Sequence, residues 1–169
     1  MTLLSRDAAG ARVVEDDPWL ALGDEAALAE VPSGADVLVS LARWRADREA
    51  LRARRGRVGL SVPGETAAEE LAPELEGVAL VVVTIPKFTD GRAYSLARLL
   101  RARFGYQGEL RARGDVLRDQ LFYLSRCGFD SFELKAGKDV SDALAAFRDF
   151  SLTYQPATDH DQPIWRRRA

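Results

Sequence analysis

The residues best suited to bind a ligand form a short polar segment, Lys87 to Arg92 (KFTDGR), which follows an apolar run at Val78–Ile85 and precedes a helical pattern at Ala93–Phe104. The apolar run is rich in β-branched residues and is followed by Pro86, a pattern typical of a buried strand. A polar segment after such a strand lies at the carboxyl edge of the sheet, where α/β folds bind their ligands. The sequence therefore predicts a small-ligand site at this edge.

The chemistry of the segment favours a small anion. Backbone N–H groups at the start of the following helix would face such a ligand, and Gly91 would permit its close approach. Lys87 or Arg92 would supply positive charge. In the alternative interpretation, Thr89 or Asp90 only caps the helix and Gly91 serves only the turn.

Neighbouring units of the expected sheet bring further candidates to the same edge. Arg111 and Glu133 occupy comparable positions on adjacent predicted strands and would form a charged pair, either inside a barrel or on a surface edge. The full set of ligand-binding candidates is Lys87, Thr89, Asp90, Gly91, Arg92, Ser95, Arg111 and Gln120. The candidates for proton transfer are Asp115, Asp119 and Glu133, although Asp115 could serve only as a helix cap.

Several classes of chemistry are excluded or disfavoured by composition. One cysteine, Cys127, and one histidine, His160, cannot build an internal disulfide, a histidine-rich metal site or an iron–sulfur cluster. No dinucleotide or Walker fingerprint occurs, and the acidic candidates are too scattered to predict a metal, so we expect neither cofactor nor metal. A net charge of −2 argues against general nucleic-acid binding. The absence of a long apolar stretch and of a signal-peptide pattern predicts a cytoplasmic protein without a membrane span.

Arginine dominates the basic residues of this chain. Of 24 basic residues, the lysines are Lys87, Lys135 and Lys138. Together with abundant alanine, this indicates a genome-wide compositional bias, so a single arginine is weak support for a site.

From Ala35 onward, strand and helix patterns alternate. This predicts an α/β fold of about five βα units with a mainly parallel sheet and strands near 37–41, 58–62, 78–85, 109–112 and 131–134. We expect a three-layer open sheet, and a partial TIM-like barrel is the alternative. A small hairpin is predicted within residues 1–30, one α/β domain over 1–152, and an extended or flexible tail over 153–169.

Local signals set the expected helix ends. One helix should pass through Trp44 and Leu51 and end at Gly56. A capping box at Thr66 and Glu69, and caps at Asp115 and at Asp139 or Ser141, should start later helices, and Gly128 should end one of them.

A specific combination of short motifs runs through the centre of the chain. The stretch from Pro86 to Asp130 reads PKFTDGRAYSLARLLRARFGYQGELRARGDVLRDQLFYLSRCGFD, and Tyr154-Gln155-Pro156 follows in the tail. The pattern combines Phe88 to Arg92 with Tyr94-Ser95, Gly105-Tyr106, Gly108 to Arg111, Gly114-Asp115, Asp119-Gln120 and Gly128 to Asp130. It resembles the bacterial domain-of-unknown-function 934 family over the central and C-terminal two thirds of the chain.

This resemblance implies a pathway but no reaction. Members of the family are commonly encoded beside sulfite or nitrite reductase, and some are labelled oxidoreductases of sulfite reduction. Our first hypothesis is an accessory or ligand-binding protein of assimilatory sulfite reduction, whose partner is sulfite reductase or another sulfur-assimilation enzyme. The alternatives are an enzyme, lyase-like, isomerase-like or an oxidoreductase of sulfite reduction, and a structural interaction domain. The oligomeric state stays open.

Overall fold

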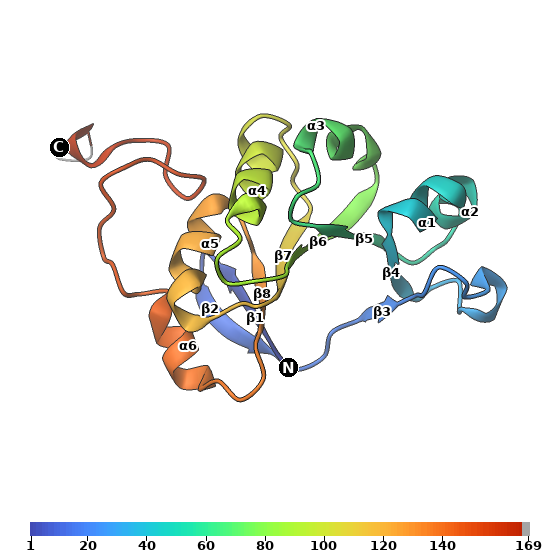
Figure 1. Ribbon diagram of the computed structural model, residues 1–169, viewed down its shortest axis with the longest axis horizontal. Coiled ribbons are helices and arrows are strands. Elements are labelled where there is room, and N and C mark those ends of the chain that lie inside the picture. Colours follow the sequence, from blue (N-terminus) through green and yellow to red (C-terminus); the bar gives the residue numbers. More distant parts are fainter. Residues whose placement is uncertain (167–169) are drawn as a thin grey trace.

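An eight-stranded sheet forms the centre of the protein in a computed structural model that describes residues 1–166. The strand order across the sheet is β2-β1-β8-β7-β6-β5-β4-β3 (Figure 1). The strands are β1 Thr2–Asp7, β2 Gly10–Val14, β3 Trp19–Ala21, β4 Asp36–Ser40, β5 Val58–Pro63, β6 Val78–Ile85, β7 Glu109–Gly114 and β8 Ser131–Leu134.

Six α-helices connect the strands or follow them. They are α1 Leu41–Ala46, α2 Arg48–Arg52, α3 Ala68–Leu71, α4 Arg92–Ala102, α5 Leu121–Cys127 and α6 Val140–Ala146. Short 3₁₀ turns lie at η1 Leu28–Glu30, η2 Ala72–Glu74, η3 Arg118–Gln120 and η4 Ile164–Arg166. None of the helices in the described part of the chain is long and apolar enough to cross a membrane.

The sheet is mixed, and the prediction of a mainly parallel sheet is wrong. Strands β3 to β8 pair in parallel and in chain order, but β1 pairs antiparallel with both β8 and β2. The expected N-terminal hairpin is present as β1 and β2, and it extends the main sheet because β1 hydrogen-bonds along β8. Sequence periodicity identified the hairpin but carried no information about its partner strand.

The sheet curls into a half-barrel, so the alternative architecture is correct and the three-layer open sheet is wrong. The edge strands β2 and β3 are joined by residues 15–18, which we call the strap. Eight flat strands would be about 34 Å wide, whereas the five peptide steps from Val14 to Trp19 reach roughly 18 Å at most. The short strap therefore requires the two edges of the sheet to approach each other.

The two faces of the sheet differ in what covers them. One set of alternating strand residues, such as Val81 and Val83, packs with the buried residues of all six helices in a single apolar core. In Figure 1, α4 and α5 lie in front of the central strands. The opposite, concave face carries a smaller apolar cluster of Leu38, Leu80 and Val82 beside Trp19. Right-handed connections between parallel strands in chain order place every helix on the same face, which leaves the concave face for other groups.

The predicted helix boundaries have mixed outcomes. The helix expected through Trp44 and Leu51 is divided into α1 and α2 at Asp47. The expected capping box is wrong, because α3 starts after Ala67, which makes no side-chain cap. Gly128 ends α5 with a φ of 111°, as predicted. The Asp139 side chain caps α6, also as predicted, by accepting from two backbone N–H groups.

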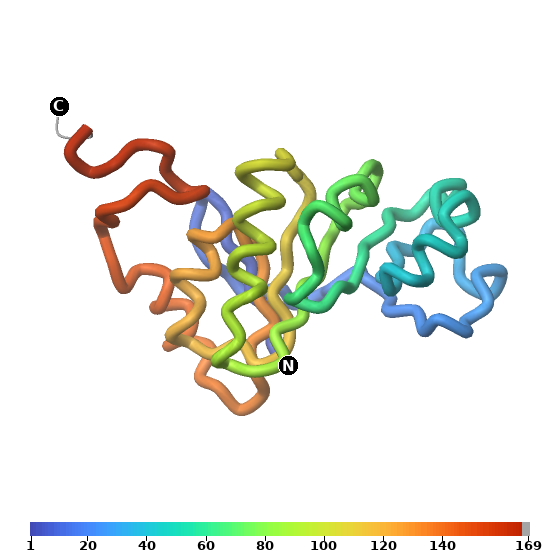
Figure 2. The backbone as a smooth tube through the Cα atoms, turned by 45° about the horizontal axis from the view of Figure 1, so that its top comes forward, coloured from blue at the N-terminus to red at the C-terminus, as the bar shows by residue number. Residues whose placement is uncertain are grey.

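The C-terminal segment runs outside the helices (Figure 2, red). It is mostly irregular and contains η4, and the backbone N–H of Thr158 donates to the carbonyl oxygen of Arg126 in α5 over 3.2 Å. The predicted tail includes residues 167–169, which lie outside the described residues.

Candidate functional site

The polar loop after β6 is held in place by residues of the next βα unit. The Asp115 carboxylate accepts a hydrogen bond from the backbone N–H of Phe88 at 2.9 Å. Asp115 therefore fastens this loop and does not cap the following helix, which begins only after η3. The predicted cap at Asp115 is wrong because its carboxylate accepts the backbone N–H of Phe88, which belongs to a different loop.

Gln120 is buried between this loop and α4. Its Nε2 donates to the hydroxyl of Tyr94 at 3.0 Å and to the carbonyl oxygen of Phe88 at 3.4 Å, while its Oε1 accepts from the backbone N–H of Leu117 at 2.9 Å. These bonds use both ends of the amide within the protein. The structure therefore gives Gln120 a role in loop position.

Arg92 lies at the start of α4 and is engaged by acidic neighbours. Its guanidinium bonds to Asp90 at 2.7 Å and lies 3.7 Å from Glu65. The side-chain hydrogen bond from Arg92, with the backbone N–H of the same residue, lowers the pKa of Asp90 to about 2. Asp90 thus occupies the helix start as an internal anion. Gly91 has a φ of −87° and open space beside it, so no left-handed conformation requires glycine there.

All three lysines of the chain gather at the carboxyl edge. Lys87 follows β6, Lys135 follows β8, and Lys138 lies in the loop before α6. The Lys135 ammonium contacts Asp115 at 2.7 Å. The pKa of Asp115 is lowered chiefly by Lys135, then by the N–H of Phe88, with a further contribution from Lys138. We call Lys87, Lys135 and Lys138, with Asp115, the lysine edge.

The lysine edge carries an excess of positive charge. Two ammonium groups, of Lys135 and Lys138, act on the Asp115 carboxylate, Lys87 adjoins Phe88 in the loop that this carboxylate holds, and all three lysine residues are exposed. Within the described residues, the side chains of Lys87 and Lys138 make no ion pair. Thr89 is exposed in the same loop as Lys87. Such an edge can attract a small anion without first breaking an internal salt bridge at Lys87 or Lys138.

Ser95 and Asp119 are both exposed and belong to different elements. Ser95 is exposed on α4 and lines a cavity of about 310 Å³ with Tyr123 and Gln155. Asp119 is exposed in η3. Among the described residues, no group of three or more histidine, cysteine, aspartate or glutamate side chains is placed to hold a metal ion.

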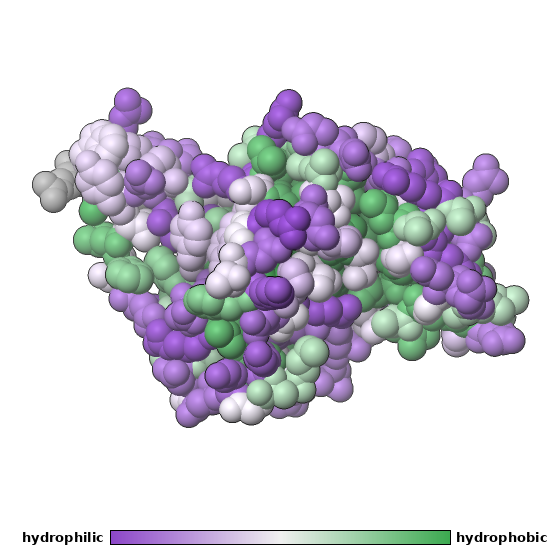
Figure 3. Space-filling view, in the orientation of Figure 1, coloured by the Kyte–Doolittle hydropathy of each residue, from purple (hydrophilic) through white to green (hydrophobic). Residues whose placement is uncertain are grey.

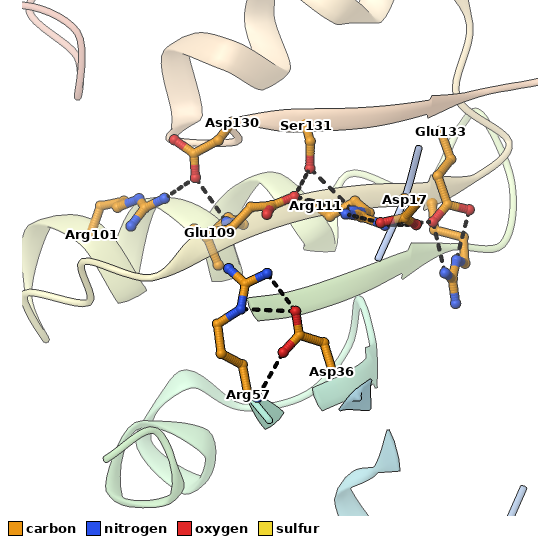
Figure 4. A network of polar contacts seen from close by, with 11 residues as sticks. Asp17, Asp36, Arg57, Arg101, Glu109, Arg111, Asp130, Ser131 and Glu133 are labelled. Atoms are coloured by element: carbon orange, nitrogen blue, oxygen red, sulfur yellow. Dashed lines mark hydrogen bonds and ion pairs between the residues drawn. The ribbon is translucent and has the colours of Figure 1, made fainter. Parts of the chain in front are cut away.

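Arg111 points to the concave face, away from the lysine edge, at the centre of a charged network (Figure 4). Its guanidinium binds Asp17 with two bonds of 2.6 and 3.1 Å and Glu109 at 3.1 Å. Glu133 lies 3.8 Å away and pairs more closely with Arg113, at 2.7 Å. Of the two alternatives for Arg111 and Glu133, the structure shows the charged pair on the inside of the half-barrel and not on a surface edge.

The electrostatics of Arg111 follow from this surrounding. Burial acts to lower the pKa of Arg111, but the hydrogen bonds that it donates to Asp17 and the charge of Glu109 hold the pKa above its ordinary value. The side chain of Arg111 is 3% exposed. A buried guanidinium is therefore compensated by several carboxylates, which is the condition under which burial of a charge is tolerated.

Sequence reasoning missed two parts of these sites. Asp17 contacts Arg111 across 94 positions of sequence, and nothing in the residues around Asp17 indicates this contact. Lys138 was not among the ligand-binding candidates. The scarcity of lysine in this arginine-rich chain was the available signal, because the three lysines follow strands or adjoin the loops after them.

Comparison with known families gives a match over most of the chain. The family described as a bacterial protein of unknown function (DUF934) matches residues 59–165. This range begins in β5 and includes the lysine edge and Arg111. No curated protein matches the chain.

Proposed function

We propose, from the premise that the chain belongs to the DUF934 family of bacterial proteins of unknown function, that it is an accessory protein of assimilatory sulfite reduction that binds a small anion at the carboxyl edge of its sheet. The observation that carries the binding part is the gathering of exposed lysines around the loop that Asp115 holds: Lys135 and Lys138 act on its carboxylate, and Lys87 adjoins Phe88, whose N–H Asp115 accepts. The pathway part rests on the family.

The choice of the lysine edge over Arg92 follows from charge. Arg92 is already paired with Asp90 and lies near Glu65, so an incoming anion would compete with two carboxylates. At the lysine edge, an anion meets exposed ammonium groups on flexible stems, which can adjust to a small oxyanion. Sulfite and sulfate are compact oxyanions that match such a cluster.

Removing lysine charge is expected to weaken anion binding. The double variant Lys87→Gln/Lys138→Gln should bind sulfite and sulfate at least about tenfold more weakly at low ionic strength, since exposed charge contacts contribute roughly threefold to fivefold each. Isothermal titration calorimetry would measure the change. Arg55→Gln/Arg148→Gln is the matched control, because both arginines are exposed outside the lysine edge and their loss changes the net charge by the same two units. Equal affinity in the lysine variant and the control would refute the site.

Loss of the gene is expected to block growth on oxidised sulfur. A deletion strain should fail on sulfate and sulfite but grow normally on sulfide and cysteine, because the proposed step lies before sulfide. Growth yields on the four sulfur sources would measure this. Restored growth on sulfate with the wild-type gene is the positive control. Normal growth on sulfate without the gene would remove the pathway assignment and leave the anion site to be judged by calorimetry.

A second candidate function, docking of a protein partner, is favoured by the C-terminal segment. Large side chains there are exposed to solvent by more than half: Phe150, Leu152, Tyr154 and Trp165. Hydrophobic residues interrupt the hydrophilic surface on the left of Figure 3, where this segment runs. Exposed aromatic residues are typical anchors of protein interfaces. An accessory protein would use such a segment to reach sulfite reductase or another sulfur-assimilation enzyme.

The geometry supports an enzyme less well than it supports an anion-binding protein. The pKa of Asp115 is lowered by Lys135, so this carboxylate stays ionised and is poorly suited to donate a proton at neutral pH. Glu133 is committed to Arg113 and Arg111.

A further inference from the structure

We propose that the concave face of the half-barrel holds a second binding site, for a small zwitterionic amino acid, and that the Asp17 carboxylate of the strap occupies this site at Arg111 when the ligand is absent. The site is distinct from the lysine edge and does not depend on the proposed function.

A cavity of about 370 Å³ lies on the concave face beneath the strap. This volume falls within the range of roughly 300 to 1,000 Å³ that is usual for small-molecule sites. Its walls combine charged groups, including Arg111 and Glu109, with the apolar surfaces of Leu3 and Trp19. The mixture of a few polar groups with apolar walls is typical of sites that orient a small molecule.

Of the two hydroxyl groups at this cavity, one lacks a hydrogen-bond partner and supports a polar ligand. Both Ser5 and Ser131 line it. The Ser131 hydroxyl is engaged by Arg111 at 3.3 Å and by Glu109. The Ser5 hydroxyl is buried and has no hydrogen-bond partner among the described residues. A buried hydroxyl without a partner is unfavourable, and a ligand in the cavity would satisfy it.

The charge of the cavity selects the ligand class. Four arginines and four acids line it, in contrast to the excess of positive charge at the lysine edge: Arg6, Arg12, Arg57 and Arg111 against Asp7, Asp17, Glu109 and Asp130. A simple anion gains little from a balanced surrounding. A zwitterion gains from both signs, because its carboxylate can form the two parallel bonds that a guanidinium offers, and its ammonium can donate to a carboxylate.

The pair of bonds from Arg111 to Asp17 is the arrangement that a ligand carboxylate would adopt. Arg111 is 3% exposed, fixed in β7, whereas Asp17 lies in the exposed strap, which has no helix or strand structure. When the strap releases Arg111, the ligand carboxylate takes the place of Asp17 and Glu109 accepts the ligand ammonium. Binding is then opposed by the internal carboxylate, as for any ligand that requires a less populated open state.

Removing the internal competitor tests this mechanism. Each of the twenty common amino acids would be titrated into the wild-type protein and into Asp17→Ala, with heat and the NMR signal of the Trp19 indole N–H as readouts. For at least one amino acid, Asp17→Ala should bind about tenfold or more tightly than the wild type, because an open state populated at about 10% or less reduces affinity by that factor. Asp16→Ala is the matched control, since within the described residues the exposed Asp16 side chain makes no hydrogen bond or ion pair.

Chemical variants of the ligand test the two charged contacts. The N-acetyl form and the methyl ester of the amino acid that binds should each lose at least about tenfold in affinity for Asp17→Ala, because each lacks one charge. The proposal is overturned if no amino acid binds Asp17→Ala, if Asp16→Ala gives the same gain in affinity, or if both blocked forms bind as well as the parent. Because these assays contain no sulfite or sulfate, their failure would leave the lysine edge untouched.

Discussion

Replacing Arg111 by alanine is expected to destabilise the protein by about 3 to 5 kcal/mol, the usual cost of removing one partner from a buried charge cluster. The Arg111 side chain is 3% exposed and compensates Asp17 and Glu109, with Glu133 at 3.8 Å. Without the guanidinium, these carboxylates would face one another beside an apolar surface. Urea unfolding at neutral pH would measure the loss of free energy.

Asp17→Ala provides the comparison within the same network. The Asp17 side chain is 35% exposed and Arg111 keeps two other acidic neighbours, so the loss should be below about 1 kcal/mol. The test is whether Arg111→Ala lowers the free energy of unfolding more than Asp17→Ala does. If Asp17→Ala costs as much as Arg111→Ala, the strap itself, and not the compensation of a buried charge, would be the source of stability.

Periodicity predicted the parallel strands well because each is buried and apolar on its helix-facing side. The predicted strands at 78–85 and 131–134 coincide with β6 and β8. It could not predict the short edge strand β3, of which only Trp19 is partly buried, nor the pairing of β1 with β8. The choice between an open sheet and a half-barrel depends on strand order and on the four-residue strap, and these are properties of tertiary pairing.

The sequence predicted the location of the candidate site better than it predicted which residues form it. The loop after β6 does lie at the carboxyl edge, and Arg111 does pair with Glu133. Residue types alone could not tell which cations are free, because that depends on neighbours distant in sequence. Arg92 forms ion pairs with Asp90 and Glu65, whereas Lys87 is exposed and makes no ion pair within the described residues. Alternation along β7 directs Arg111 to the concave face, away from the loop with which it had been grouped.

Gly114→Ala is expected to be strongly destabilising, by at least about 3 kcal/mol, since backbone strain alone costs roughly 1 to 3 kcal/mol and a steric clash adds to it. Gly114 ends β7 with a φ of 108°, a backbone conformation that residues other than glycine rarely adopt. A Cβ there would lie 2.3 Å from the carbonyl oxygen of Ile85 in β6. That oxygen accepts the N–H of Asp115 at 2.9 Å, so relief of the clash would move the residue that holds the loop of Phe88.

Gly91→Ala is the matched control for this substitution. Gly91 has a φ of −87° and nothing within 4 Å of an added Cβ, so only the weaker capping ability of alanine opposes the change, at about 1 kcal/mol or less. Thermal or urea unfolding of both variants would give the comparison. Because Gly114 adjoins Asp115, Gly114→Ala should also weaken sulfite binding per folded molecule at the lysine edge. A stable Gly114→Ala protein would show that the turn between β7 and Asp115 adopts another conformation in solution.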